Sequence, residues 1–340
     1  MTTEVAAPVT PQRIYQMAWG YAPPLILEAA IRHRVFDVLD AGPMSVAEVS
    51  QATGASERGL TAIMNALVGL EFLARNSGDG KYSLAPESAA FLVSTKPEFQ
   101  GGIIRHTSQH LVPKWLNLSR IVASGQPVEA VNQEQTGSEF FHNFVNDIFP
   151  MSYGAARELA AHLDLDRAGG PVSLLDLASG SGVWGIALAQ NSPQVRVTAV
   201  DWHGVIPLTR SNAERFGLAE RFTFVEGDLL QAEFGSGHHV ATLGHILHSE
   251  GVDHSKALLK KTFEALAHGG TIAIAEFLVN ADRTGPLNSL LFAVNMLVNT
   301  EAGNTYSGDE IGAWLQEAGF ANVRTLEAHG PSPLILATRP

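Results

Sequence analysis

The chain has 340 residues, of which 45% are hydrophobic and 16% are charged, a composition typical of a globular protein with room for two hydrophobic cores. Its formal net charge of −12 argues against nucleic-acid backbones or anionic membranes as its main partners. The absence of cysteine excludes disulfides, thiolate metal sites and a cysteine nucleophile. No apolar run approaches the roughly 18 residues of a membrane span, and residues 1–12 lack a signal-peptide pattern, so we expect a cytoplasmic protein.

The first 95 residues have the patterns of several helices and a hairpin. Residues 14–38 show helical apolar spacing and are expected to form two helices that meet at Pro23-Pro24. A capping box at Ser45 starts a short helix, and a longer one is expected over 56–72. Turn residues then lead into a short strand within 76–84. Helix, turn, helix and hairpin together predict a winged helix.

The charge of this segment bears on its role. A winged helix that reads DNA needs basic residues on its second helix, but here Arg58 stands against Glu57 and Glu71. The balance favours a scaffold that forms a dimer interface. A winged-helix regulator with a ligand-sensing second domain stays as an alternative from another functional class.

From residue 172 onward, strands alternate with helices, which predicts an α/β fold with a doubly wound, mostly parallel sheet. The last two strands are joined by only six residues, too few for a crossover, so they should form a reversed terminal hairpin. The expected strands are 172–177, 195–200, 221–225, 240–243, 271–279, 323–327 and 334–338, and the expected helices begin at 183 and span 206–216, 255–267 and 307–319.

The most informative stretch is the loop over residues 176–182, directly after the first of these strands. Its small residues Ala178, Gly180 and Gly182 allow the backbone to approach a ligand at the carboxyl end of the strand. The next strand ends in Asp201, whose carboxylate can bind both hydroxyls of a ribose.

This loop resembles the D-x-G-x-G-x-G motif of class I S-adenosylmethionine-dependent methyltransferases, with Ala178 in place of the first glycine. The N-terminal pattern, the order of strands and helices, and the segment Ile246-Leu247-His248-Ser249 after the fourth strand are similar to the two-domain O-methyltransferase family. That family is typified by plant phenolic and bacterial polyketide-tailoring enzymes, and the resemblance covers nearly the whole chain.

The resemblance implies a class I methyltransferase fold in three segments: a winged-helix-like dimerisation domain over 1–105, a helical linker that contributes to the acceptor pocket over 106–168, and a catalytic domain over 169–340. It further implies S-adenosylmethionine as cofactor, S-adenosylhomocysteine as product, a homodimer through the N-terminal domain, and a small aromatic or polyketide-like hydroxyl acceptor. The family's general base falls on His248. An imidazole can take the proton of a phenol as the methyl group is transferred.

Further cofactor contacts are expected at the strand ends. Asp176 either receives the amino group of the methionine portion or caps the following helix. Asp228 can accept the exocyclic amine of adenine, and Leu229 can pack on its face. Trp202 is either a second wall of the adenine slot or a surface ring. The acceptor pocket is expected to include Phe141, Phe149, Met151, His245, Asn295, Met296 and Asn299.

The chain departs from the family near the base. Gly244 and His245 stand where the plant enzymes have Lys-Trp, and the acid that orients the base there falls on Thr305. Glu276 and Glu301 are possible substitutes. This departure keeps open C- or N-methyl transfer, for example to a keto acid, with a metal held by His245 and His248 as a less favoured possibility.

Overall fold

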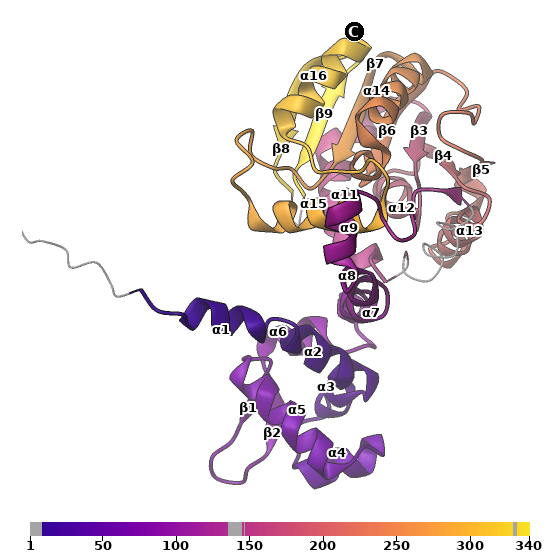
Figure 1. The fold of residues 1–340 in the computed structure, drawn as a ribbon. Coiled ribbons are helices and arrows are strands. Elements are labelled where there is room, and N and C mark those ends of the chain that lie inside the picture. Colours follow the sequence, from indigo (N-terminus) through magenta and orange to yellow (C-terminus); the bar gives the residue numbers. More distant parts are fainter. Residues whose placement is uncertain (1–8, 135–144, 146, 329–331) are drawn as a thin grey trace, which may run out of the picture. The chain divides into compact units, whose positions relative to one another are not determined.

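The computed structural model describes residues 9–134, 145, 147–328 and 332–340 (Figure 1). Contacts divide the chain into two compact units, Met1–Val112 and Pro113–Pro340. The division into three segments with a first boundary at residue 105 stays a prediction. No helix in the described ranges is long and apolar enough to cross a lipid bilayer.

The first unit is a small helical body with one hairpin. Its elements are α1 (Gln12–Ala18), α2 (Ala22–Arg32), α3 (Val35–Leu39), α4 (Val46–Thr53), α5 (Glu57–Gly69), β1 (Leu73–Arg75), β2 (Tyr82–Leu84), α6 (Pro86–Phe91), α7 (Gly101–His106) and a π-helical turn (Thr107–Leu111). β1 and β2 pair antiparallel, and the capping box at Ser45 is confirmed. The description as a winged helix stays a prediction.

The prediction of two helices over 14–38 was wrong, because the segment forms three. Pro23 and Pro24 lie in the first turn of α2, where their missing N–H groups cost the helix nothing. The real break before α3 is Arg34, which adopts a left-handed conformation with a φ of 57°. Proline therefore starts a helix here, where the sequence pattern was interpreted as a break.

The second unit contains a seven-stranded sheet. Its elements are α8 (Val112–Trp115, which begins at the last residue of the first unit), α9 (Leu118–Ser124), α11 (Phe149–Leu163), a 3₁₀ turn (Leu165–Ala168), β3 (Val172–Leu177), α12 (Val183–Asn191), β4 (Val195–Asp201), α13 (Ile206–Arg215), a 3₁₀ turn (Ala219–Arg221), β5 (Phe222–Glu226), β6 (His238–Gly244), α14 (Leu247–Ala265), β7 (Leu266–Ala275), α15 (Leu287–Asn299), α16 (Gly308–Ala318), β8 (Ala321–Leu326) and β9 (Leu334–Thr338).

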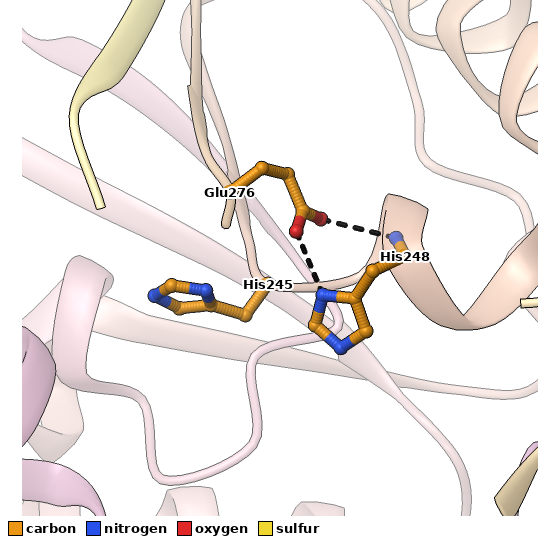
Figure 2. A group of neighbouring side chains, drawn as sticks. All are labelled: His245, His248 and Glu276. Carbon is orange, nitrogen blue, oxygen red and sulfur yellow. Dashed lines mark hydrogen bonds and ion pairs between the residues drawn. The ribbon is translucent and has the colours of Figure 1, made fainter. Parts of the chain in front are cut away.

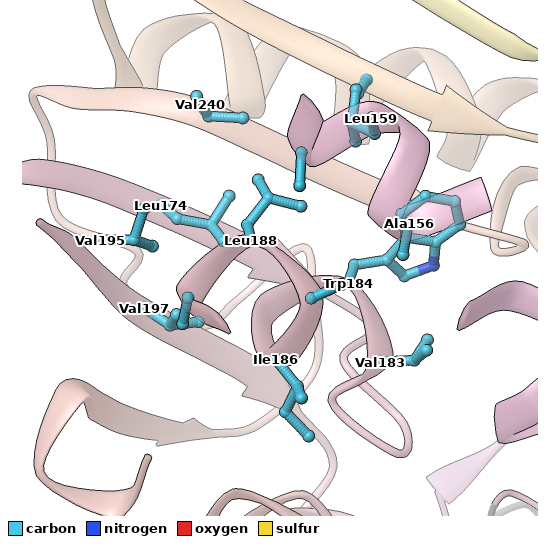
Figure 3. Close-up of a cluster of buried hydrophobic side chains, with 14 of the residues drawn as sticks. Ala156, Leu159, Leu174, Val183, Trp184, Ile186, Leu188, Val195, Val197 and Val240 are labelled. Atoms are coloured by element: carbon cyan, nitrogen blue, oxygen red, sulfur yellow. The ribbon is translucent and has the colours of Figure 1, made fainter. Parts of the chain in front are cut away.

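The strand order is β5-β4-β3-β6-β7-β9-β8, with β9 antiparallel to both neighbours and the other pairs parallel. The predicted parallel sheet with a reversed terminal hairpin is thus confirmed. One hydrophobic cluster packs the sheet against α11, α12 and α13 (Figure 3), and a second packs it against α14 and α16. The order of strands reverses between β3 and β6, and such a switch point is where α/β sheets bind ligands.

Two predicted boundaries were wrong, and both matter for the site. The helix expected over 255–267 begins earlier, at Leu247, and continues across a non-helical Gly251. The strand expected over 271–279 spans Leu266–Ala275 instead. Glu276 is therefore the first residue beyond a strand end.

Candidate active site

The loop after β3 is a tight, backbone-lined turn. Ala178, Gly180 and Gly182 all have positive φ, at 51°, 53° and 74°. The N–H of Gly180 donates to Oδ2 of Asp201 over 2.7 Å, which ties the ends of β3 and β4 together. The turn carries no side chain at its two glycines, of which Gly180 is half-buried and Gly182 is buried.

Helix α13 supports this loop from beneath. The Thr209 hydroxyl donates to the carbonyl of Gly180 over 2.7 Å, and the Asn212 amide donates to the carbonyl of Ser181 over 3.0 Å. Both side chains are buried. The sequence analysis missed them, although two polar residues three apart on a helix that packs against the sheet were an available signal.

Asp176 lies under the loop and is completely buried. It accepts hydrogen bonds from the Thr242 hydroxyl over 2.7 Å and from the Gly185 N–H over 3.0 Å. Burial raises its pKa to about 7, although these two hydrogen bonds act in the opposite direction. This geometry matches the helix-cap interpretation, since both carboxylate oxygens face partners within the chain.

Asp201 is half-buried at the end of β4. Besides Gly180, it accepts the N–H of Trp202 over 2.8 Å. Burial raises its pKa to about 6, against the effect of these hydrogen bonds. Two hydrogen bonds leave a carboxylate with further acceptor capacity for the hydroxyls of a ribose.

The remaining predicted cofactor residues follow β4 and β5. Trp202 is half-buried. Asp228 is exposed and accepts the N–H of Leu230 over 2.9 Å, which leaves its second oxygen without a hydrogen bond among the described residues. Leu229 is half-buried and packs against the sheet's second hydrophobic cluster. Lys261 holds this segment by donating to the carbonyls of Leu229 and Ala232.

His248 and Glu276 form a buried pair at the ends of two neighbouring strands (Figure 2). Nδ1 of His248 lies 2.7 Å from Oε2 of Glu276, and the His248 N–H donates to Oε1 over 3.2 Å. The exposed fractions of the two residues are 9% and 3%. Burial would raise the pKa of Glu276, but the neighbouring His248 and its hydrogen bonds outweigh this and lower it.

Aromatic rings surround this pair. The ring of Phe292, on α15, meets that of His248 edge-on at a centroid distance of 4.9 Å, and Phe277 packs on Phe292 at 4.1 Å. His245 lies 5.0 Å from Phe277 and 6.3 Å from His248. Phe277 and Phe292 were not predicted, because an apolar residue in an expected strand or helix cannot be distinguished from core by sequence.

His245 follows β6 with a φ of 64°, and its N–H donates to the Ala275 carbonyl over 2.9 Å. Burial lowers its pKa to about 4, so the ring is neutral near pH 7. Its Nδ1 is enclosed and has no hydrogen-bond partner among the described residues. Ligand atoms of His245, His248 and Glu276 all lie within 4.8 Å of one another, a set of donors that could hold a divalent metal.

The structure also distinguishes between the two acids considered as partners of His248. Glu301 is exposed and accepts from the Gln133 amide over 3.0 Å, whereas Glu276 contacts His248 directly. Thr305, where the family's acid falls, is 1% exposed, and its hydroxyl has no partner among the described residues.

The predicted acceptor-pocket residues separate into two groups. Asn295, Met296 and Asn299 lie on α15, the helix that carries Phe292, and Asn295 and Asn299 are hydrogen-bonded to each other. Phe149, at the start of α11, belongs to the hydrophobic cluster and stacks on Phe216 at 5.6 Å, and its place in the pocket stays a prediction.

The other two predicted pocket residues add little to this picture. Met151 is half-buried on α11. Phe141 lies outside the described residues.

Comparisons with known proteins agree with this architecture. Family models match for the O-methyltransferase domain over residues 128–321 and for the O-methyltransferase dimerisation domain over 15–94. The 3-hydroxy-5-methyl-1-naphthoate 3-O-methyltransferase of Streptomyces sahachiroi is 30% identical, covering 94% of this chain and 92% of its own length. The tetracenomycin polyketide synthesis 8-O-methyltransferase of Streptomyces glaucescens is 26% identical, covering 97% of each.

Among solved structures, human N-acetylserotonin methyltransferase in complex with S-adenosylmethionine has a TM-score of 0.85 at 23% identity, covering 98% of this chain and 99% of that one, a likeness of fold. The fold, the loop at the switch point and the family matches together define an S-adenosylmethionine-dependent methyltransferase. More particularly, the chain belongs to the O-methyltransferase family that pairs this catalytic domain with a dimerisation domain.

Proposed function

We propose that this chain methylates a hydroxyl group of a small aromatic, polyketide-like acceptor, with His248 as the general base and Glu276 as the acid that orients it. The observation that carries the proposal is the 2.7 Å contact between His248 Nδ1 and the buried Glu276 carboxylate. A carboxylate accepts only, so it fixes the proton of the neutral imidazole on Nδ1 and leaves Nε2 free of hydrogen. Nε2 is then the atom that accepts the hydroxyl proton.

The charge that forms on the imidazole is balanced by the same acid. When Nε2 takes a proton, the ring becomes a cation beside a carboxylate held at two points by His248 itself. The pair lies among Phe277 and Phe292, so water screens this attraction only weakly. The carboxylate thereby stabilises the imidazolium that forms when a phenol, with a pKa near 10, loses its proton to His248.

The residues of the loop fit S-adenosylmethionine. The turn is tight at Gly180 and Gly182, and Asp201 keeps acceptor capacity for the ribose, while Asp228 keeps an oxygen for the adenine amine. Bound there, the cofactor supplies an electrophilic methyl group on a sulfonium. The chain's contribution is to hold the nucleoside and to place the acceptor hydroxyl between His248 and the switch point.

The orientation of Asn295 supports an acceptor with a second oxygen. The Trp115 indole N–H only donates, and it lies 3.0 Å from Oδ1 of Asn295, which also accepts from the Asn299 amide over 3.1 Å. The Nδ2 group of Asn295 therefore faces away from both, and it has no acceptor among the described residues. Asn295 lies one helical turn from Phe292, whose ring contacts that of His248. A carbonyl or carboxylate on the side of the acceptor opposite the reacting hydroxyl would therefore meet the Nδ2 group of Asn295.

The test is a His248→Ala variant assayed on a panel of aromatic hydroxyl acceptors. We expect activity to fall by about 100-fold or more on every accepted substrate, while S-adenosylhomocysteine binding in a calorimeter stays within about twofold. His254→Ala, an exposed histidine on the same helix, is the matched control and should keep full activity. Full activity of His248→Ala on every acceptor would rule out the base assignment.

A second candidate is C-methyl transfer at an enolised keto acid, with a metal held by His245, His248 and Glu276. The clustering of these three ligands supports it. The double hydrogen bonding of Glu276 to His248 and the enclosed Nδ1 of His245 favour the metal-free pair. Loss of activity in a chelator and its recovery on adding a divalent metal would favour the second candidate.

We also infer that the chain forms a homodimer through its N-terminal unit. No residue of α1 is buried in the single chain, although this helix carries Ile14, Tyr15 and Met17. Trp19, just beyond it, has an exposed fraction of 68%. Such an apolar surface is typical of a contact with another protein, and residues 15–94 match the family's dimerisation domain.

A further inference from the structure

Gly244, the last residue of β6, has no room for a side chain. A Cβ atom built there would lie 1.9 Å from Nε1 of Trp184, 2.5 Å from Cδ1 and 2.8 Å from Cε2. The contact is with a large ring held by the core, so it could not be relieved by a small rotation. The indole of Trp184 thus occupies the space that a side chain at position 244 would take.

Trp184 belongs to the first turn of α12, which begins directly after the loop at Gly182. Its exposed fraction is 4%, and Figure 3 draws it in the buried cluster that also contains Ala156. No hydrogen bond of Nε1 is found among the described residues. An indole N–H only donates, so a bound ligand with an acceptor at this position would gain a hydrogen bond from Trp184.

This unpaired N–H lies at the switch point of the sheet. Trp184 follows β3 through the loop, and the residue it touches ends β6, the strand on the other side of the switch point. The first turn of α12 presents main-chain N–H groups at the same place, and a helix N-terminus favours an anion. The Trp184 donor and the N-terminus of α12 therefore both lie at the switch point.

We propose that Nε1–H of Trp184 donates a hydrogen bond to the carboxylate of the amino-acid portion of S-adenosylmethionine. The nucleoside end is accounted for by Asp201 on β4 and Asp228 after β5, so the amino-acid end extends toward β3 and β6. Asp176, the acid at the end of β3, would repel the ligand's carboxylate if the two groups faced each other, but Asp176 is buried under the loop. The inference rests on the cofactor use described above, and not on which acceptor is methylated.

Replacement of the indole by a ring without a donor separates this role from packing. Trp184→Phe keeps an aromatic ring but removes the N–H. Two probes are used in calorimetry: S-adenosylhomocysteine, which has the amino-acid portion, and 5′-methylthioadenosine, which has the same nucleoside and sulfur but lacks it. Thermal unfolding of the variant reports whether it folds.

We expect Trp184→Phe to weaken S-adenosylhomocysteine binding by about 10- to 100-fold, the range of a hydrogen bond to a charged group, with 5′-methylthioadenosine binding changed less than about threefold. Equal weakening of both ligands would assign Trp184 to packing alone and overturn the proposal, as would no change for either. If the unchanged chain bound neither probe, cofactor use itself would fail, which is a different result from equal weakening.

Discussion

Replacement of Glu276 by glutamine tests the active-site pair most directly, because it keeps the shape of the side chain and removes its charge. Glu276 accepts two N–H groups from one residue, the main-chain N–H and Nδ1 of His248. A carboxamide has a single acceptor atom, so its NH₂ group must face one of these two nitrogens. If it faces Nδ1, the ring proton moves to Nε2, and the imidazole can no longer act as a base there.

The magnitude follows from the charge that is lost. With the imidazolium and carboxylate centres about 4 Å apart and an effective dielectric constant of about 20, their attraction is ~4 kcal/mol. Because about 1.4 kcal/mol corresponds to a tenfold change in rate, we expect Glu276→Gln to lower kcat by about 1000-fold.

The assay is kcat at saturating S-adenosylmethionine and acceptor, with S-adenosylhomocysteine binding as the measure of an intact cofactor site. Glu301→Gln is the matched control, since Glu301 is exposed and contacts Gln133 instead of the base. A Glu276→Gln variant that folds, binds the product normally and keeps kcat within about threefold of the unchanged chain would refute the reasoning.

Three further outcomes are expected. Asp201→Asn should weaken S-adenosylhomocysteine binding by about 10-fold or more in calorimetry, because an amide accepts ribose hydroxyls at one atom only; unchanged affinity would contradict the ribose assignment. Burial raises the pKa of Asp176 to about 7 from an ordinary 3.8, so the folded chain keeps a proton that the unfolded chain releases above about pH 4. Stability should thus fall by about 1.4 kcal/mol per pH unit up to about pH 7, and urea unfolding of Asp176→Asn at pH 5, 6 and 7 should lack this slope. Trp19→Glu, which places a charge on the exposed apolar surface of the N-terminal unit, should shift the chain toward monomer in sedimentation; an unchanged mass would contradict the proposed dimer.

The sheet was largely predictable because its signals are local. Most parallel strands are apolar runs that end in a polar or small residue, as at Asp201. The six residues between the last two predicted strands allowed only an antiparallel pair. The errors came where tertiary packing decides. Pro23 and Pro24 fit both a helix break and a helix start, and Ala275 ends β7 although apolar residues continue after it.

Sequence proposes candidate site residues where a residue type and a strand end coincide, as at His248 and Asp201, and their roles stay predictions. Glu276 and Glu301 could not be ranked, because only the pairing of β6 with β7 brings one of them to the base. Trp184 has no sequence signal of this kind. A tryptophan in a helix that is buried on nearly all sides cannot be distinguished from a core residue by sequence. Only the structure shows that its ring fills the space beside Gly244.

The pairing of β6 with β7 has a consequence for how this enzyme could be altered. Gly244 and Ala275 are partners in the ladder, and the histidine and glutamate lie a few residues beyond this one rung. A shift of β7 by a single position would turn the glutamate to the opposite face of the sheet. The turnover rate therefore depends on the alignment of β6 with β7. Residues inserted where α14 meets β7, between Ala265 and Leu266, should leave activity intact only while Gly244 and Ala275 stay paired.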